Sequence, residues 1–178
     1  TDKAIIYLQQ ALDIKRKLGG ERDPDFEVSQ GDMGKILRDS RKWEQAYDVL
    51  SRNLALSREL YGEDSENVAV SHNEFAYLLH DMGRFKEAAD EYRAAMAIHR
   101  RLGNEDAGIS VIPLNNLASA LEDRGEYAAA EPLFRRSLEL RRKTLDADSS
   151  MIAHGEYNLA RLLLKMGKPG EAGELDAS

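Results

Sequence analysis

Apolar residues recur at helical spacing in two consecutive runs of the segment 68–109. In the first run, Val68–Met82, they fall on one face of a helix, and Gly83 follows. A residue without a Cβ can adopt the left-handed conformation that closes a helix end. The second run, Phe85–Leu102, is again amphipathic and leads into a polar connection. The segment therefore predicts two antiparallel helices joined by a tight turn.

The same pattern returns every 42 residues through almost the whole chain. The step is kept by a small residue, by an aromatic residue and by the turn glycine: Ala46, Ala88, Ala130 and Ala172; Trp43, Phe85 and Tyr127; Gly83, Gly125 and Gly167. A fixed period of this length is typical of stacked repeats. We therefore predict an all-α fold, an α-solenoid of antiparallel helix pairs. Its parts would be a half repeat at 1–25, repeats at 26–67, 68–109 and 110–151, and a truncated repeat at 152–178.

Small residues also keep the period within the first helix of each pair, at Gly34, Ala76, Ala118 and Ala160. Where two helix backbones approach to about 8 Å, only a small side chain fits between them. These positions are therefore predicted helix crossings. One departure from the pattern is Arg41, which stands where the other pairs have the turn glycine.

Composition narrows the range of partners and locations. A net charge of −7 over 178 residues argues against nucleic acid and against an acidic membrane surface. No apolar stretch approaches the roughly 20 residues of a membrane span, so no membrane partner is expected. The chain has no cysteine, which favours a reducing compartment, and we expect a cytoplasmic location.

Little in the sequence indicates catalysis, a metal or a cofactor. His72 and His80 flank Glu74, but residues eight apart lie about 12 Å apart along a helix, too far to share a metal ion. No glycine-rich phosphate loop and no recognisable nucleophile setting is present. We therefore expect a non-enzyme without cofactor or metal.

Basic runs occur on the predicted second helices, at 100–101, 135–136 and 141–143. Acidic residues such as Glu131 and Glu139 stand three or four places away, where helical side chains meet. We interpret these runs as solvated faces with ion pairs and not as a site for an anionic partner.

Three segments carry a resemblance to a known family: Leu114–Ala118 (LNNLA), Arg124–Tyr127 (RGEY) and Ala130–Leu140 (AEPLFRRSLEL). Together they resemble the tetratricopeptide repeat. The 42-residue length is similar to that of kinesin light chains and of many bacterial multidomain proteins. The resemblance implies a right-handed superhelix that serves as an interaction scaffold. The His-Pro that kinesin-type repeats carry between pairs is absent here, which favours a module of a bacterial multidomain protein.

The resemblance also implies a concave groove, lined by the first helices, that receives a peptide or a partner helix. The residues expected to bind there are Lys35, Arg38, Asn73, Glu74, Tyr77, Asp81, Asn115, Asn116, Ser119, Glu122, Asp123, Tyr157, Asn158, Arg161 and Lys165. The remaining groove-facing positions are Val28, Gly31, Asp32, Asp39, Val70, His80, Ile112, His154 and Leu164.

Two asparagines, Asn116 and Asn158, match the family position whose amide grips the backbone of a bound peptide. An amide side chain offers donors and an acceptor and can bind main chain regardless of sequence. The alternative is that each amide satisfies a neighbouring helix.

Three carboxylates, Asp39, Asp81 and Asp123, fall at the C-terminal ends of the first helices. A carboxylate there faces the negative end of the helix dipole and needs compensation. One hypothesis is a salt bridge to a nearby arginine, namely Arg41, Arg84 or Arg124. The other is an acidic ledge for a basic partner.

The predicted groove is acidic in its middle, where Glu74 and Glu122 join the aspartates, and basic at its C-terminal end, where Arg161 and Lys165 lie. Converging carboxylates on a concave surface reinforce one another. The sequence therefore favours a basic protein or peptide as partner.

The function favoured by the sequence is a non-catalytic scaffold for protein–protein interaction. A first alternative is a regulatory domain of a larger signalling enzyme, such as a kinase or an ATPase, with an intramolecular partner. A second is a self-assembly module that forms weak homo-oligomers through apolar ends. The ends would expose Ile5, Leu8, Leu12 and Ile14 on the helix 3–19, and Leu159, Leu162 and Leu163 at the other end.

Overall fold

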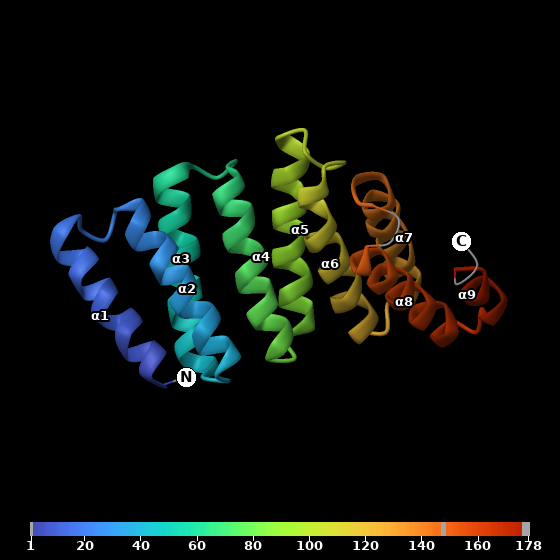
Figure 1. Cartoon of the computed structure of the whole chain (residues 1–178), viewed down its shortest axis with the longest axis horizontal. Coiled ribbons are helices and arrows are strands. Elements are labelled where there is room, and N and C mark those ends of the chain that lie inside the picture. Colours follow the sequence, from blue (N-terminus) through green and yellow to red (C-terminus); the bar gives the residue numbers. More distant parts are fainter. Residues whose placement is uncertain (1, 147–148, 176–178) are drawn as a thin grey trace. The chain divides into compact units, whose positions relative to one another are not determined.

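The computed structural model describes residues 2–146 and 149–175. These residues form nine α-helices and one short 3-10 helix and contain no strand (Figure 1). They divide into two compact units, Thr1–Arg84 and Phe85–Ser178, and each unit is described by itself.

The first unit consists of four helices: α1 (Asp2–Leu18), α2 (Pro24–Asp39), α3 (Trp43–Tyr61) and α4 (Glu66–Asp81). Each helix packs against the next one, and α2 also contacts α4. The buried residues that join them include Phe26, Leu37, Leu50, Leu54 and Phe75. The start of α2 follows the expected chemistry, since the side chain of Asp23 accepts the N–H of Asp25.

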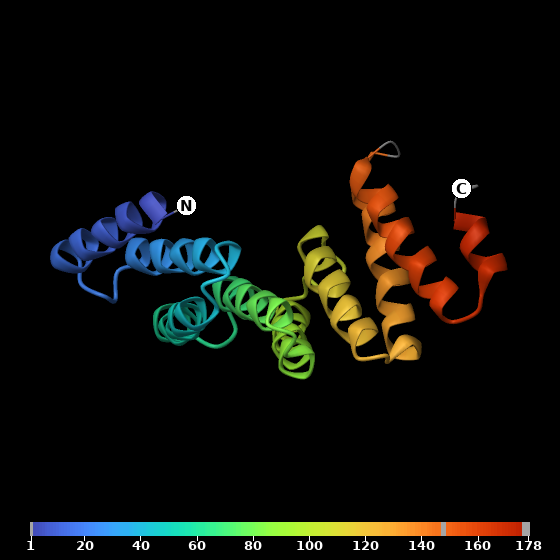
Figure 2. The same ribbon diagram turned by 90° about the horizontal axis from the view of Figure 1, so that it is seen from below.

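The second unit consists of α5 (Phe85–Arg101), the 3-10 helix η1 (Gly108–Ser110), α6 (Val111–Asp123), α7 (Tyr127–Thr144), α8 (Ser150–Lys165) and α9 (Pro169–Leu175). Here too, each α-helix packs against its successor, as Figure 2 shows for α6, α7, α8 and α9. The side chains of Tyr92, Phe134, Leu140, Leu159 and Leu162 are almost fully buried.

The predicted small residues lie where helices are close. Ala46, Ala88 and Ala130 have no exposed surface. A Cβ added to Gly34 would lie 2.4 Å from two carbons of the Leu50 side chain, so α2 and α3 leave no room for it. Glycine at this crossing is therefore required by packing.

Four turns join the helices of a pair with the same two backbone hydrogen bonds. After α4, Gly83 N–H donates to His80 O (2.9 Å) and Arg84 N–H donates to Leu79 O (2.8 Å). This is the Schellman arrangement, which needs a residue at positive φ. Gly83, Gly125 and Gly167 adopt φ of 74–78°. Arg41 adopts the same conformation, with φ 56°, and is the one non-glycine residue with positive φ in the described ranges.

Replacing Arg41 with Gly should therefore stabilise the chain by about 0.5–1 kcal/mol. A side chain in the left-handed region costs about 1–2 kcal/mol, and the greater freedom of glycine in the unfolded chain offsets part of the gain. Urea unfolding of the two proteins measures the difference. A variant that is less stable than the parent would show that the arginine side chain makes a compensating contact.

The expectation of exposed apolar ends is wrong for the C-terminal end. Leu159, Leu162 and Leu163 are buried, because α9 packs against α8 despite its short length. In α1, Leu12 is buried too, whereas Ile14 is exposed together with Ile6 and Tyr7. The self-association hypothesis therefore loses one of its two apolar ends.

Candidate binding surface

Large apolar side chains are exposed on the first helix of each pair. They are Val28 on α2, Val70 and Tyr77 on α4, Ile112 on α6, and Met151, Tyr157 and Leu164 on α8. All but Met151 occupy positions that the sequence assigned to the groove, so the first helices of each unit offer apolar contact area to a partner. In the described residues of the second helices α3, α5 and α7, no large apolar side chain is exposed, but α1, the second helix of the half repeat, exposes Ile6, Tyr7, Ile14 and Leu18.

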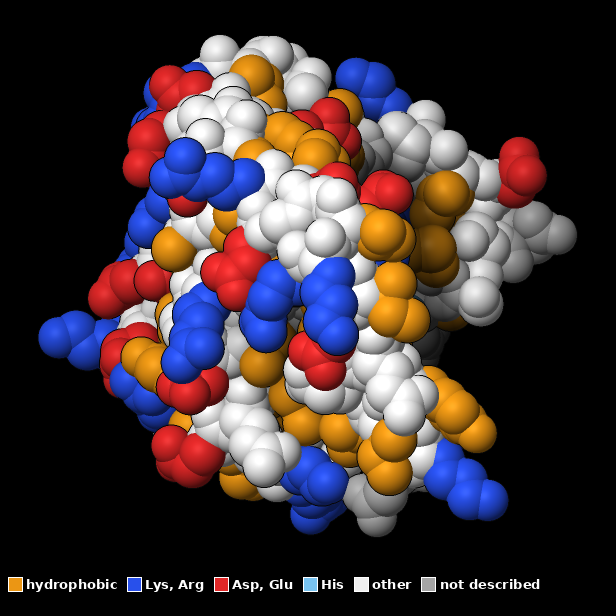
Figure 3. Space-filling view, turned by 90° about the vertical axis from the view of Figure 1, so that its left-hand side faces the viewer, with side chains coloured by type: hydrophobic (Ala, Val, Ile, Leu, Met, Phe, Trp, Pro, Cys, Tyr) orange, Lys and Arg blue, Asp and Glu red, His pale blue; other side chains and the backbone are white. Residues whose placement is uncertain are grey.

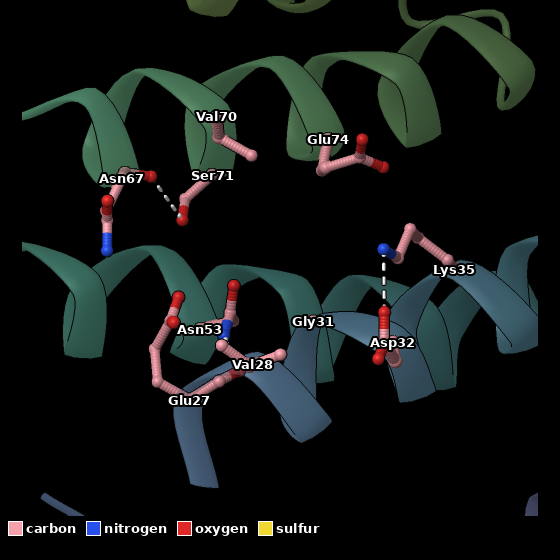
Figure 4. A pocket seen from close by; sticks show the side chains of 10 residues that line it. All are labelled: Glu27, Val28, Gly31, Asp32, Lys35, Asn53, Asn67, Val70, Ser71 and Glu74. Atoms are coloured by element: carbon pink, nitrogen blue, oxygen red, sulfur yellow. Dashed lines mark hydrogen bonds and ion pairs between the residues drawn. The ribbon is translucent and has the colours of Figure 1, made fainter. Parts of the chain in front are cut away.

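A pocket of about 250 Å³ opens between α2, α3 and α4 in the first unit (Figure 4). Its walls carry Val28 and Val70, and its deeper part carries Glu27, Asn53 and Ser71. Asn53 and Glu27 are buried, and the Asn53 amide donates to the backbone carbonyl of Glu27 at 2.7 Å.

Glu27 was not among the predicted residues, although the sequence contained a signal for it. The positions one and two repeats later hold Ala69 and Val111, so an acid replaces a buried apolar residue at this step. Burial raises the pKa of the Glu27 carboxyl, and hydrogen bonding from Asn53 offsets part of that effect.

Arg38 pairs with three acidic residues of the first unit. Its guanidinium nitrogens lie 3.0 Å from Asp39, 3.6 Å from Glu74 and 3.6 Å from Asp81. The same guanidinium stacks over the ring of Tyr77, 4.6 Å from its centre. Asp39 and Asp81 thus form salt bridges, as the first hypothesis expected, with an arginine that this hypothesis did not name.

In the second unit, the acidic residue Glu122 pairs with two basic side chains. Arg161 donates to both its oxygens, at 3.1 and 2.7 Å, and Lys165 Nζ lies 2.8 Å away. Only 1% of the Glu122 side chain is exposed. Burial alone would raise the pKa of this carboxyl, but hydrogen bonds from Arg161 and Lys165 outweigh it and lower the pKa.

These contacts show how far the charges of the predicted pattern are paired. Arg38 is one positive charge among Asp39, Glu74 and Asp81, and Glu122 is one negative charge between Arg161 and Lys165, so these ion pairs balance the acidic and the basic cluster only in part. The prediction did not include these pairs, because it placed residues on a common face without allowing long side chains to reach across one repeat. On the face that Figure 3 shows, acidic and basic side chains are likewise interleaved.

The two predicted asparagines have different environments. Asn158 is buried, and its amide donates to Asn115 Oδ1 (3.1 Å) and lies 3.2 Å from the His154 ring nitrogen. Asn116 is half-buried, and its amide nitrogen has no hydrogen-bond partner among the described residues. The geometry favours a structural role for Asn158, whereas the Asn116 amide nitrogen is itself buried and forms no hydrogen bond among the described residues.

The other predicted residues are distributed over both units. Lys35 pairs with Asp32 at 2.7 Å, and this hydrogen bond raises the pKa of the lysine. The Arg161 guanidinium lies 5.9 Å from the centre of the Tyr157 ring. Asn73 and Ser119 are half-buried on α4 and α6, while Asp123 is exposed at the end of α6.

The basic runs of α7 form ion pairs for the most part. Arg135 lies 2.8 Å from Glu131, Arg136 pairs with Asp106, and Arg142 lies 2.7 Å from Glu156. Arg141 differs, since it is buried and donates to the carbonyl of Met151 at 2.5 Å. Burial lowers the pKa of its guanidinium.

Within the described residues, no group of three or more His, Asp or Glu side chains is placed to hold a metal ion. None of the helices in the same ranges has the length and apolar character of a membrane span.

Comparison with known proteins identifies the architecture. The family profile described as tetratricopeptide repeat matches residues 25–101 and 110–175. The search of curated proteins returned no significant match.

Several solved structures share the fold. The nearly identical repeats of a protein assigned as a kinesin light chain of Podospora anserina are 21% identical, with a TM-score of 0.82 over 98% of this chain and 82% of that one. BtubC (BKLC) from P. vanneervenii is 20% identical, with a TM-score of 0.86 over 98% of this chain and 69% of that one. A Rap protein complexed with Competence and Sporulation Factor is 16% identical, with a TM-score of 0.68 over 97% of this chain and 56% of that one.

Proposed function

Because the chain belongs to the tetratricopeptide repeat family, whose fold is typical of interaction scaffolds, we propose that it is a non-catalytic scaffold that binds a peptide or a partner helix with its first helices. The observation that carries this proposal is the distribution of exposed apolar side chains. Such side chains lie on α2, α4, α6 and α8, whereas in the described residues of α3, α5 and α7 none is exposed. Helix α1 also exposes Ile6, Tyr7, Ile14 and Leu18.

Exposure of large apolar side chains on these helices is unfavourable in water unless a partner covers them. Exposed aromatic and aliphatic side chains are the residues from which interface hot spots are built. A Rap protein, which is complexed with a factor in its solved structure, is a further example of this fold with a bound partner.

The test begins with capture of partners by the immobilised chain and identification of the bound segment by peptide mapping. Tyr157→Ala should then weaken binding of that peptide about tenfold or more in calorimetry, because an exposed aromatic anchor is lost. Tyr7→Ala is the matched control, since Tyr7 is 69% exposed on α1 and Tyr157 is 62% exposed on α8. Equal losses from both variants, or a loss from Tyr7→Ala alone, would contradict binding by the first helices.

A further inference from the structure

Lys15 of α1 reaches a polar pair at the start of α2. Its ammonium donates to Ser29 Oγ at 2.7 Å and to the backbone carbonyl of Asp25 at 3.0 Å. Ser29 Oγ in turn donates to the same carbonyl at 2.9 Å. A hydroxyl and a backbone carbonyl near the start of α2 thus bind the ammonium group of Lys15 together.

The same polar pair recurs 42 residues later without its lysine. Ser71 Oγ donates to the carbonyl of Asn67 at 3.0 Å, as Ser29 does to that of Asp25. The position equivalent to Lys15 is Ser57, which is buried and whose hydroxyl has no well-formed hydrogen bond in the described structure. In the next two repeats this position holds His99 and Arg141, so Ser57 is the one small side chain among the four.

Ser57 does not itself line the pocket between α2, α3 and α4, but it lies close to the carboxyl of Glu27, which does. Asn67 and Ser71 line it, and Glu27 and Asn53 project into it from the opposite side (Figure 4). Val28 and Val70 form apolar walls that suit the methylene stem of a lysine. The cavity volume of about 250 Å³ leaves room for one side chain.

Glu27 makes the site negative. Only 7% of Glu27 is exposed, and none of the ion pairs of the described residues involves it. The other two carboxylates of the pocket already have a cationic neighbour, since Asp32 pairs with Lys35 and Glu74 shares Arg38 with Asp39 and Asp81. A buried carboxylate without a cation attracts one strongly, because the surrounding dielectric is low.

We propose that this pocket binds the ammonium group of a lysine side chain from a partner peptide, held by Glu27, Ser71 Oγ and the carbonyl of Asn67. The bound lysine takes the position that Lys15 takes one repeat earlier. This inference rests on the proposed function, because it names the side chain that the first-helix surface recognises. It also places the cation preference at Glu27, away from Asp39 and Asp81, which pair with Arg38.

The probe is a capped pentapeptide with one lysine between alanines, titrated into the ¹⁵N-labelled chain and followed by the amide signals of Gly31, Asn53 and Ser71. We expect saturable shifts of these signals, and binding at least about tenfold weaker for the peptide with norleucine, which keeps the stem and lacks the charge. Equal binding of both peptides would overturn the inference. So would shifts with n-butylamine but none with the lysine peptide, because the site would then serve a free amine.

Two variants separate recognition from folding. Glu27→Gln should weaken the lysine peptide about tenfold and leave the melting temperature at pH 7 unchanged or higher, since burial of the ionised carboxylate opposes folding. Ser57→Lys should abolish binding of the peptide and raise the melting temperature, because the new ammonium fills the site from within. Ala55→Lys on the exposed side of α3 is the control for added charge and should change neither.

The outcomes also distinguish this inference from the proposed function. If the captured partner still needs Tyr157 but tolerates Glu27→Gln and Ser57→Lys, the lysine site is wrong and the scaffold stands. If the partner is insensitive to Tyr157→Ala as well, both fail.

Discussion

Replacing Glu122 with Gln should lower the free energy of unfolding by about 2–3 kcal/mol at neutral pH. Removing one partner of a fully buried ion pair costs about 3–5 kcal/mol. The smaller figure applies here because the side chains of Arg161 and Lys165 are 40% and 43% exposed and regain water when the carboxylate is lost. Urea denaturation of both proteins gives the difference.

The pH dependence of this difference follows from the lowered pKa of Glu122 in the folded chain. A carboxyl that is more acidic when folded stabilises the fold above its unfolded pKa, about 4.5, and loses that contribution as the pH falls through the folded value. The gap between parent and variant should therefore be full at neutral pH and narrow below about pH 4.5. Glu126→Gln is the control, because Glu126 pairs with Arg124 at an exposed position and should cost less than about 1 kcal/mol. Similar costs for the two variants would show that burial of Glu122 adds nothing.

Two glycines of α2, three residues apart, should respond to the same substitution with opposite signs. Gly34→Ala places a methyl group 2.4 Å from the Leu50 side chain, and overpacking of this kind costs about 1–3 kcal/mol. Gly31→Ala brings its methyl no closer than 3.5 Å to Asn53 and should gain about 0.5–1 kcal/mol from better helix propensity.

Thermal and urea unfolding of both variants measures this contrast. A shared gain would mean that Leu50 can move aside without loss, and the close approach of α2 and α3 at Gly34 would not limit stability. A shared loss would point to a different problem, since Gly31 has the space for a methyl group.

The helices and their turns could be predicted from the sequence because they depend on local chemistry. Apolar spacing placed α4 and α5, and the 42-residue step placed the turn at Gly83. Even the exception at Arg41 was visible, although the sequence did not say whether the residue keeps the left-handed conformation. The family resemblance was confirmed by the profile match and by the similar solved structures.

The charge distribution could not be predicted in the same way. Glu122 and Arg161 are 39 residues apart and meet only because consecutive first helices lie side by side. Nor does the sequence specify that Arg38 reaches both Glu74 and Asp81. The spacing of residues along a helix identifies the face on which a side chain lies. The length and direction of that side chain decide which opposite charge it pairs with.

The turns within the pairs have a consequence for how such a chain can vary. Three residues separate α2 from α3, α4 from α5, α6 from α7 and α8 from α9. An inserted residue would rotate the following helix by about 100° and turn its apolar face away from its partner. The connections between pairs are less uniform, with five residues at 19–23 and four at 62–65. Insertions and deletions among relatives should therefore collect between pairs, and the turn before each second helix should keep its length.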